Sequence, residues 1–148
     1  PKVISRKPWR LNLGANWDPD GVSFRVWAPK CKKVDVVLQQ DQQVIPLEKK
    51  EDGYFVGRSG PLSIGTLYRY RIDGDKEYPD PCSRFQPEGP HGPSMIVDPY
   101  RYQWHDHEWK GVTMKGQVIY ELHIGAFTPE GTFDAAIREL PELKQLGI

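Results

Sequence analysis

The chain has 148 residues, of which 20 are basic and 20 acidic, so its formal net charge at neutral pH is zero. Because proteins that bind nucleic acid gain affinity from clustered Lys and Arg, this balanced and interspersed charge predicts no nucleic-acid partner. No hydrophobic run approaches the roughly 20 residues of a membrane-spanning helix, and residues 1–7 lack a signal-peptide core, so we expect a cytoplasmic globular protein without a membrane partner. Cys31 and Cys82 lack CxxC spacing and are expected to be free thiols.

Residues 1–77 are expected to form an immunoglobulin-like β-sandwich, so the fold class is mainly β. In Gly21–Ala28 every second residue is hydrophobic, and Trp27 lies on the opposite face. This period of two is typical of a half-buried strand, and Asp-Gly pairs tolerate the positive φ angles of tight hairpins. Further alternating runs lie at Val34–Leu38, around Val44 before Pro46, at Tyr54–Val56 and at Tyr68–Ile72, and the turns at Asp20–Gly21, Asp52–Gly53 and Asp73–Gly74.

Residues 78–116 are expected to be a Pro-rich connector with little regular structure, because proline lacks the N–H that a β-ladder needs. His105 and His107 lack further ligands at a usable spacing for Zn²⁺, so no metal site is predicted. The aromatic residues of the segment predict packing and not a free linker. Those expected to pin it are Phe85, Tyr100, Tyr102, Trp104 and Trp109.

Residues 117–148 are expected to form one β/α unit. Val118–Ile124 is a mostly hydrophobic run of strand length. A helix should begin at the N-cap Thr132 and end at Gly147, with a kink at Pro141. Its expected buried stripe is Phe133, Ile137, Leu140, Leu143 and Leu146.

Two segments resemble the maltooligosyltrehalose trehalohydrolase family of the α-amylase superfamily of glycoside hydrolases. They are Pro79–Ser94 (PDPCSRFQPEGPHGPS) and Ile119–Phe133 (IYELHIGAFTPEGTF). Cys82 and Ala126 depart from the Ala and Thr usual in the family. The run Phe24–Pro29 (FRVWAP) is similar more widely to the N-terminal sandwich of branching and debranching enzymes. A carbohydrate-binding or scaffold module of a glycogen branching or isoamylase-type debranching enzyme is therefore the alternative.

The resemblance implies an enzyme that cleaves the α-1,4 bond next to the terminal trehalose of maltooligosyl trehalose, without a metal or cofactor. Hydrolysis with retention uses two carboxylates about 5 Å apart. The acidic residues of the family follow the fourth, fifth and seventh strands of a barrel that needs about 250 residues. We therefore expect an N-terminal portion of such an enzyme, ending in the first β/α unit of a truncated (β/α)8 barrel at residues 117–148 and inactive by itself.

Three residues are candidates for substrate binding. Glu121 and His123 alternate along the expected barrel strand, whose C-terminal end would border the active-site face; a hydrogen-bonded pair within the barrel wall is the alternative. Trp27 faces away from the core and suits the apolar face of a sugar ring, as do Trp9 and Trp17 unless they pack in the interior. The expected partners are α-glucan or maltooligosyl trehalose and the missing barrel. The hydrophobic residues of 118–148 are expected to dock on the sandwich, to pair between chains in self-association, or to remain mobile.

Overall fold

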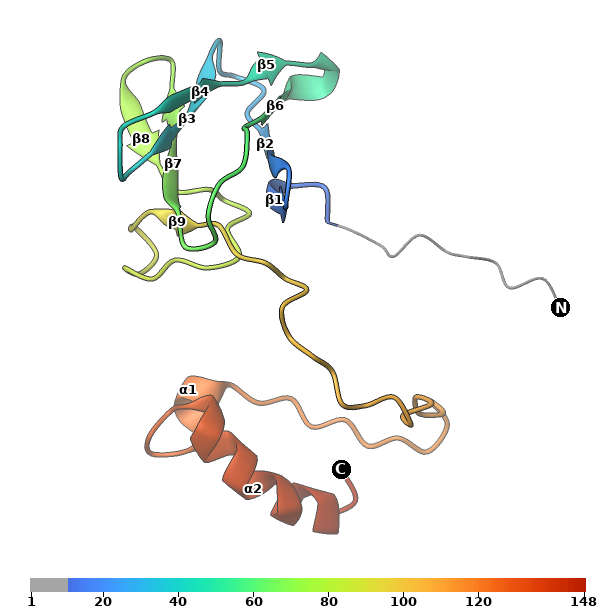
Figure 1. Cartoon of the computed structure of the whole chain (residues 1–148). Coiled ribbons are helices and arrows are strands. Elements are labelled where there is room, and N and C mark those ends of the chain that lie inside the picture. The colour runs from blue at the N-terminus through green and yellow to red at the C-terminus, as the bar shows by residue number, and fades with distance from the viewer. Residues whose placement is uncertain (1–10) are drawn as a thin grey trace, which may run out of the picture. The chain divides into compact units, whose positions relative to one another are not determined.

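The computed structural model describes residues 11–148, which fall into two compact units, one ending at Gln103 and one covering Trp104–Ile148 (Figure 1). The candidate Trp9 lies outside the described residues. None of the helices in the described part of the chain is long and hydrophobic enough to cross a membrane.

The first unit is a sandwich of two antiparallel sheets, as the sequence predicted. The first sheet contains, in order, β1 (Gly14–Asp18), β2 (Gly21–Trp27), β6 (Tyr54–Arg58) and β5 (Glu48–Lys49). The second contains β4 (Val44–Pro46), β3 (Val34–Leu38), β7 (Leu67–Ile72) and β8 (Lys76–Tyr78), in that order. The short strand β9 (Ser94–Met95) also pairs with β7, and a 3-10 turn, Glu51–Gly53, precedes β6.

The core lies between the two sheets and follows the predicted alternation. In β2 the side chains of Val22, Phe24 and Val26 are buried, whereas Trp27 is exposed. Phe24 meets Tyr68 of the opposite sheet edge-to-face, with ring centroids 5.3 Å apart. Edge-to-face packing suits the charge distribution of aromatic rings. The remaining buried core comprises Ala15, Val34, Val36, Leu38, Ile45, Leu47, Phe55, Tyr70 and Ile96.

Strand β3 departs from simple alternation because it is buried on both faces. Asp35 is only 2% exposed and Val37 is fully buried, although neither belongs to the core cluster. The Asp35 carboxylate forms an ion pair with Lys33 Nζ at 2.9 Å. The strand lies between β4 and β7, and Asp35 is in register with Pro46 of β4 and Arg71 of β7.

Two of the three predicted Asp-Gly turns adopt the expected backbone. Asp52 and Gly53 have φ angles of 64° and 81°, and Asp73 and Gly74 have 50° and 80°. At the third turn only Gly21 has a positive φ, and there a Cβ atom would collide with the carbonyl oxygen of Ser59. Glycine is required at this position by close backbone approach as well as by conformation.

The second unit contains two helices, α1 (Ile124–Phe127) and α2 (Phe133–Gln145). The strand predicted at Val118–Ile124 is not formed, because residues 117–123 have no regular secondary structure and Ile124 begins α1. A strand requires a hydrogen-bonded neighbour, and no other strand is described within this unit. The assignment of residues 117–148 to a barrel stays a prediction.

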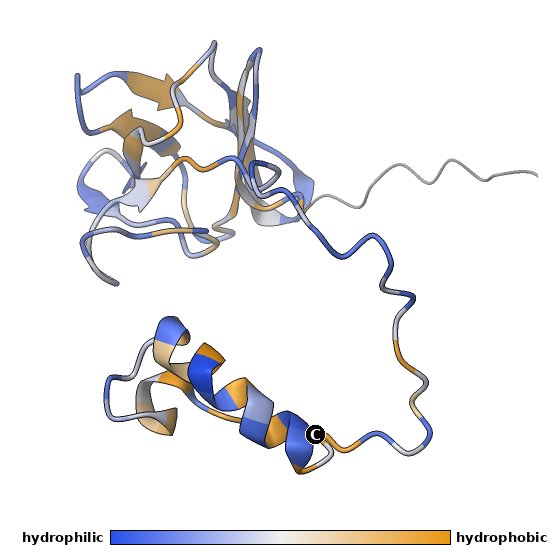
Figure 2. Cartoon of the chain, turned by 60° about the horizontal axis from the view of Figure 1, so that its bottom comes forward, coloured by the Kyte–Doolittle hydropathy of each residue, from blue (hydrophilic) through white to orange (hydrophobic). Residues whose placement is uncertain are grey.

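Helix α2 begins and ends where the sequence predicted. The Thr132 hydroxyl accepts a hydrogen bond from the Ala135 N–H at 3.2 Å, and Gly147 has a φ of 88° just after the helix. The predicted buried stripe, however, is wrong. Phe133 is 73% exposed, and Ile137, Leu140 and Leu146 are also exposed, whereas the buried positions are Ala135 and Ala136. The hydrophobic segments along the helix are visible in Figure 2. Within the described part of this unit the only other helix is one turn long, too short to cover such a stripe.

Candidate functional site

The Pro-rich segment is attached to the sandwich by a buried polar network around Asp80, which is 2% exposed. One carboxylate oxygen of Asp80 accepts hydrogen bonds from the hydroxyls of Tyr68 at 2.6 Å and Tyr70 at 3.3 Å. The other accepts from the Cys82 N–H at 2.7 Å, and the Asp80 N–H donates to the Ser94 hydroxyl at 2.9 Å. These bonds connect the beginning of the segment to β7 and to β9.

Arg84 extends this attachment to the first sheet. Its guanidinium donates to the carbonyl oxygen of Ala15 and, at 2.7 Å, to the side-chain oxygen of Asn16. Gly14 allows the close approach, because a Cβ atom there would lie 2.8 Å from the Cys82 carbonyl oxygen. In Pro79–Ser94, the first of the two segments that carry the family resemblance, Asp80, Cys82, Arg84 and Ser94 therefore have structural roles.

The aromatic residues expected to pin the Pro-rich segment lie at its surface. Phe85, Tyr100, Tyr102, Trp104 and Trp109 are all exposed. The buried positions in the segment include Asp80, Ser94 and Ile96. The short polar side chains of Asp80 and Ser94 satisfy hydrogen bonds of the backbone and of the tyrosine hydroxyls, and β9 adds a two-residue ladder with β7.

Burial raises the pKa of the Asp80 carboxyl above its ordinary value of 3.8, although hydrogen bonds from Tyr68, Cys82 and Tyr70 oppose this effect. A raised folded-state pKa means that the folded protein binds the proton more tightly than the unfolded chain. We therefore expect the free energy of unfolding of the wild type to rise, relative to Asp80→Asn, as pH falls from neutral toward 3.8. Urea titrations of both proteins across this range test the sign.

Hydrogen bonds from Arg58 lower the pKa of Asp18, and hydrogen bonds from the Lys33 and Lys32 backbone lower that of Asp73. These two groups make the free energy of unfolding fall as pH falls, which is opposite to the effect of Asp80. Both proteins contain these groups, so their effect cancels in the difference. If the free energies of unfolding of the wild type and Asp80→Asn changed with pH in parallel, the raised pKa of Asp80 would be contradicted.

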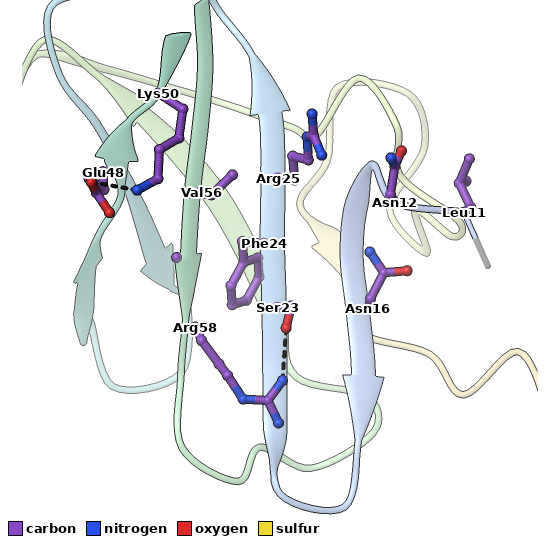
Figure 3. Close-up of a pocket in the computed structure, with 11 residues that line it drawn as sticks. Leu11, Asn12, Asn16, Ser23, Phe24, Arg25, Glu48, Lys50, Val56 and Arg58 are labelled. Carbon is purple, nitrogen blue, oxygen red and sulfur yellow. Dashed lines mark hydrogen bonds and ion pairs between the residues drawn. The ribbon is translucent and has the colours of Figure 1, made fainter.

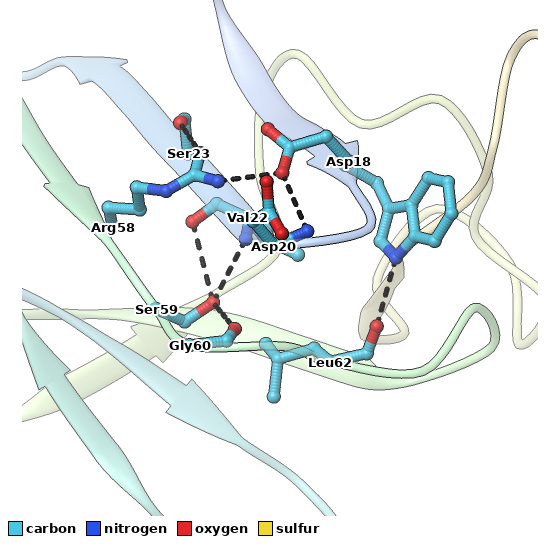
Figure 4. Close-up of polar contacts among 9 residues, drawn as sticks. Asp18, Asp20, Val22, Ser23, Arg58, Ser59, Gly60 and Leu62 are labelled. Atoms are coloured by element: carbon cyan, nitrogen blue, oxygen red, sulfur yellow. Dashed lines mark hydrogen bonds and ion pairs between the residues drawn. The ribbon is translucent and has the colours of Figure 1, made fainter.

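The outer face of the first sheet carries the candidate Trp27. The side chain is 60% exposed, and its indole N–H donates to the Asp52 carbonyl oxygen at 3.0 Å. Tyr54 lies directly across on β6. The guanidinium carbon of Arg25 lies 4.2 Å from the centre of the Tyr54 ring, a cation–π contact. Trp17, by contrast, packs against the core and donates to the Leu62 carbonyl oxygen at 2.9 Å (Figure 4), in agreement with interior packing.

A hollow of about 520 Å³ lies on this outer face, beside Arg25 (Figure 3). Arg58 on its border donates to the Ser23 hydroxyl at 2.8 Å and to the Asp18 carboxylate at 2.7 Å (Figure 4). This hollow is not predicted by the sequence, although alternation places Ser23 and Arg25 on the same face as Trp27. The residues lining it are Leu11, Asn12, Asn16, Ser23, Phe24, Arg25, Glu48, Lys50, Val56, Gly57 and Arg58.

Glu121 and His123 lie in the second unit, in the segment without regular structure, and both are exposed. The His123 carbonyl oxygen accepts hydrogen bonds from the N–H groups of Ala126 and Phe127 and so begins α1. A second hollow of about 440 Å³, lined by Tyr120 and seven residues from Phe127 to Leu146, includes neither side chain in its lining. Trp27 thus belongs to one unit and the other two candidates to the other, and the role of all three stays a prediction.

The His105–Glu108 run is exposed. Within residues 11–148 no three His, Cys, Asp or Glu side chains gather in a way that could hold a metal ion.

Comparison with known proteins identifies relatives in one enzyme superfamily. The chain is 41% identical over 138 residues to a malto-oligosyltrehalose trehalohydrolase of Saccharolobus solfataricus, covering 93% of this chain and 24% of that protein. A crystal structure of a putative alpha amylase from Salmonella typhimurium matches with a TM-score of 0.84 and 39% identity, over 95% of this chain and 24% of the other. A pullulanase mutant from Paenibacillus barengoltzii, solved with maltotetraose, matches with a TM-score of 0.54 and 25% identity over 60% of this chain and 15% of its own.

The resemblance to trehalohydrolases is thereby confirmed, and the chain spans about a quarter of the length of the relative named above. Residues 12–101 match carbohydrate-binding module 48, the isoamylase N-terminal domain. This match contains every strand of the sandwich and more than half of the sequence, and the chain accordingly belongs to the carbohydrate-binding module 48 family.

Proposed function

We propose that these 148 residues are the N-terminal portion of a glycoside hydrolase that cleaves the α-1,4 bond next to the terminal trehalose of maltooligosyl trehalose and releases trehalose. The observation that carries this proposal is the extent of the match to the trehalohydrolase. Its 138 residues are 93% of the chain and must therefore continue from the sandwich well into residues 104–148. The pullulanase match covers only 60% of the chain.

In this proposal the chain divides into a sandwich at 1–77, a connector at 78–116 and the first β/α unit of a barrel at 117–148. The sandwich takes α-glucan as its partner, with Trp27 as a stacking side chain. Glu121 and His123 approach the substrate from the first barrel strand. The catalytic carboxylates belong to later barrel strands, and the neighbouring strands and helices of the barrel would cover the exposed hydrophobic residues of α2.

The proposal is tested by comparing two proteins, the 148-residue chain and the full product of the gene that encodes it. Each is incubated with maltotriosyl trehalose, and trehalose is measured by chromatography. We expect trehalose from the gene product and none from the 148-residue chain, because retaining hydrolysis needs a pair of carboxylates about 5 Å apart.

Parallel incubations with amylose and with pullulan separate the alternative functions. New α-1,6 branches in amylose, or cleavage of pullulan without trehalose release, would replace the proposal with a branching or debranching activity. Trehalose release by the 148-residue chain itself would overturn the assignment of catalysis to other parts of the protein.

A further inference from the structure

The hollow on the outer face of β2 and β6 is amphipathic in the way that a sugar-binding surface must be. Val56 and Leu11 supply hydrophobic area, and Ser23, Asn12 and Asn16 supply hydroxyl and amide groups around it. Its volume of about 520 Å³ is within the range of small-molecule sites. A pyranose ring has apolar faces and a rim of hydroxyls, so both kinds of lining group have a counterpart on it.

The charged groups of the hollow are held in place by neighbours. Arg58 is fixed by its bonds to Ser23 and Asp18, and Arg25 by its contact with the Tyr54 ring. The Nε atom of Arg25 is buried and has no hydrogen-bond partner within the described residues. An unpaired buried donor is costly, and the outer nitrogens of the same guanidinium are the groups that a ligand hydroxyl would use. Groups fixed before binding lose less conformational entropy when the ligand arrives.

The charge balance favours a neutral ligand over an anion. Lys50 is paired with Glu48, and Arg58 with Asp18, so two of the three cations on the lining already have carboxylate partners. An anion would have to displace these carboxylates. A neutral polyhydroxyl ligand can accept and donate hydrogen bonds while the ion pairs stay intact.

Trp27 extends the same face beyond the hollow. Ser23, Arg25 and Trp27 project from one side of β2, and Arg58 and Tyr54 lie opposite Ser23 and Trp27 on β6. At about 3.3 Å per residue, the four steps from Ser23 to Trp27 give a strip about 13 Å long. The strip therefore begins at a polar hollow and ends at an exposed indole.

We propose that this strip binds a segment of α-glucan, with one glucosyl unit in the hollow and a neighbouring unit stacked on Trp27. The inference rests on α-glucan as the partner in the proposed function, and it adds the sheet, the face and the residues that make the contact. Arg25 and Arg58 donate to sugar hydroxyls, and Val56 contacts an apolar ring face.

The test is a titration of the ¹⁵N-labelled 148-residue chain with maltoheptaose, followed by amide chemical shifts. We expect the largest changes in β2 and β6, with small changes in β3, β7 and β8. Trp27→Ala and Arg58→Gln should each weaken binding by about five- to tenfold. The matched control is Lys76→Gln, which removes an exposed cation from β8 of the second sheet and should leave the affinity unchanged.

Arg58→Gln is expected to fold, because an exposed ion pair contributes at most about 1 kcal/mol, and its amide spectrum verifies this directly. Changes centred on the second sheet, a loss of affinity in Lys76→Gln alone, or no change at millimolar maltoheptaose would overturn the inference. The trehalose assay is a separate measurement. Trehalose release by the full gene product, without binding to the strip, would reject this inference and leave the proposed function standing. Binding to the strip, without trehalose release by the full gene product, would reject the proposed function and leave this inference standing.

Discussion

Asp80→Ala is expected to lower the free energy of unfolding of the sandwich by roughly 3 kcal/mol. The substitution leaves the hydroxyls of Tyr68 and Tyr70 and the N–H of Cys82 without their acceptor. Each buried donor left unpaired costs about 1–3 kcal/mol, and relief of the buried charge offsets part of this sum. Urea unfolding followed by tryptophan fluorescence measures the change.

Tyr70→Phe is the matched control, because it removes only the 3.3 Å bond and leaves the carboxylate with its other partners. It should cost about 1 kcal/mol. Amide hydrogen exchange gives a second measurement. In Asp80→Ala, exchange should accelerate in residues 80–96 before it does so in β2. Equal stability of Asp80→Ala and the wild type would mean that the network does not hold the segment.

Phe24→Ala is expected to destabilise the sandwich by about 3–5 kcal/mol, which is typical of a buried phenylalanine replaced by alanine. The ring is 1% exposed and meets Tyr68 edge-to-face from the other sheet, so its removal leaves a cavity between the two layers. Thermal and urea unfolding of the purified chain measure the loss.

Val44→Ala provides the comparison for Phe24→Ala, because Val44 is an exposed residue on the edge strand β4. Its effect should lie within about 0.5 kcal/mol of zero. If the two substitutions had similar effects, the core between the sheets would not be the main source of stability.

Strand β2 could be predicted because one of its faces is buried and the other is more exposed. The spacing of Val22, Phe24 and Val26 is sufficient to predict their burial. The Asp-Gly pairs predict where two of the hairpins turn. Asp35 could not be predicted as buried, because alternation places it on the face of β3 that points away from the core cluster. Alternation reports the face of a residue and not what lies above that face.

The ends of α2 could likewise be predicted, whereas its packing could not. Thr132 and Gly147 act on the backbone immediately beside them, so local sequence is sufficient. Burial of Ile137 and Leu140 depends on a partner surface, and within the described residues of its unit α1 is too short to supply one. Residues 117–123, before α1, form no strand for the same reason: a strand needs a second chain segment to hydrogen-bond with it.

The polar attachment of the Pro-rich segment was the largest feature that sequence reasoning missed. Proline and aromatic content suggested packing by rings, but the anchors are Asp80, Arg84 and Ser94. A single short side chain in a loop carries no periodic signal. Trp27 was the opposite case, because alternation predicted its exposure and thereby indicated the face on which the hollow lies.

Strand β9 has a consequence for self-association by strand addition. The edge of β7 that faces away from β3 is occupied by β8 at Tyr70–Ile72 and by β9 at Leu67–Tyr68. The edge strands on that side are therefore β8 and β9, which are three and two residues long, and such short strands offer few unpaired N–H and C=O groups to a foreign chain. On the other side of the sheet, β4 is three residues long and contains Pro46, which cannot donate to an incoming partner. Strand addition to this sheet should therefore become easier when β9 detaches and uncovers Leu67 and Tyr68 of β7.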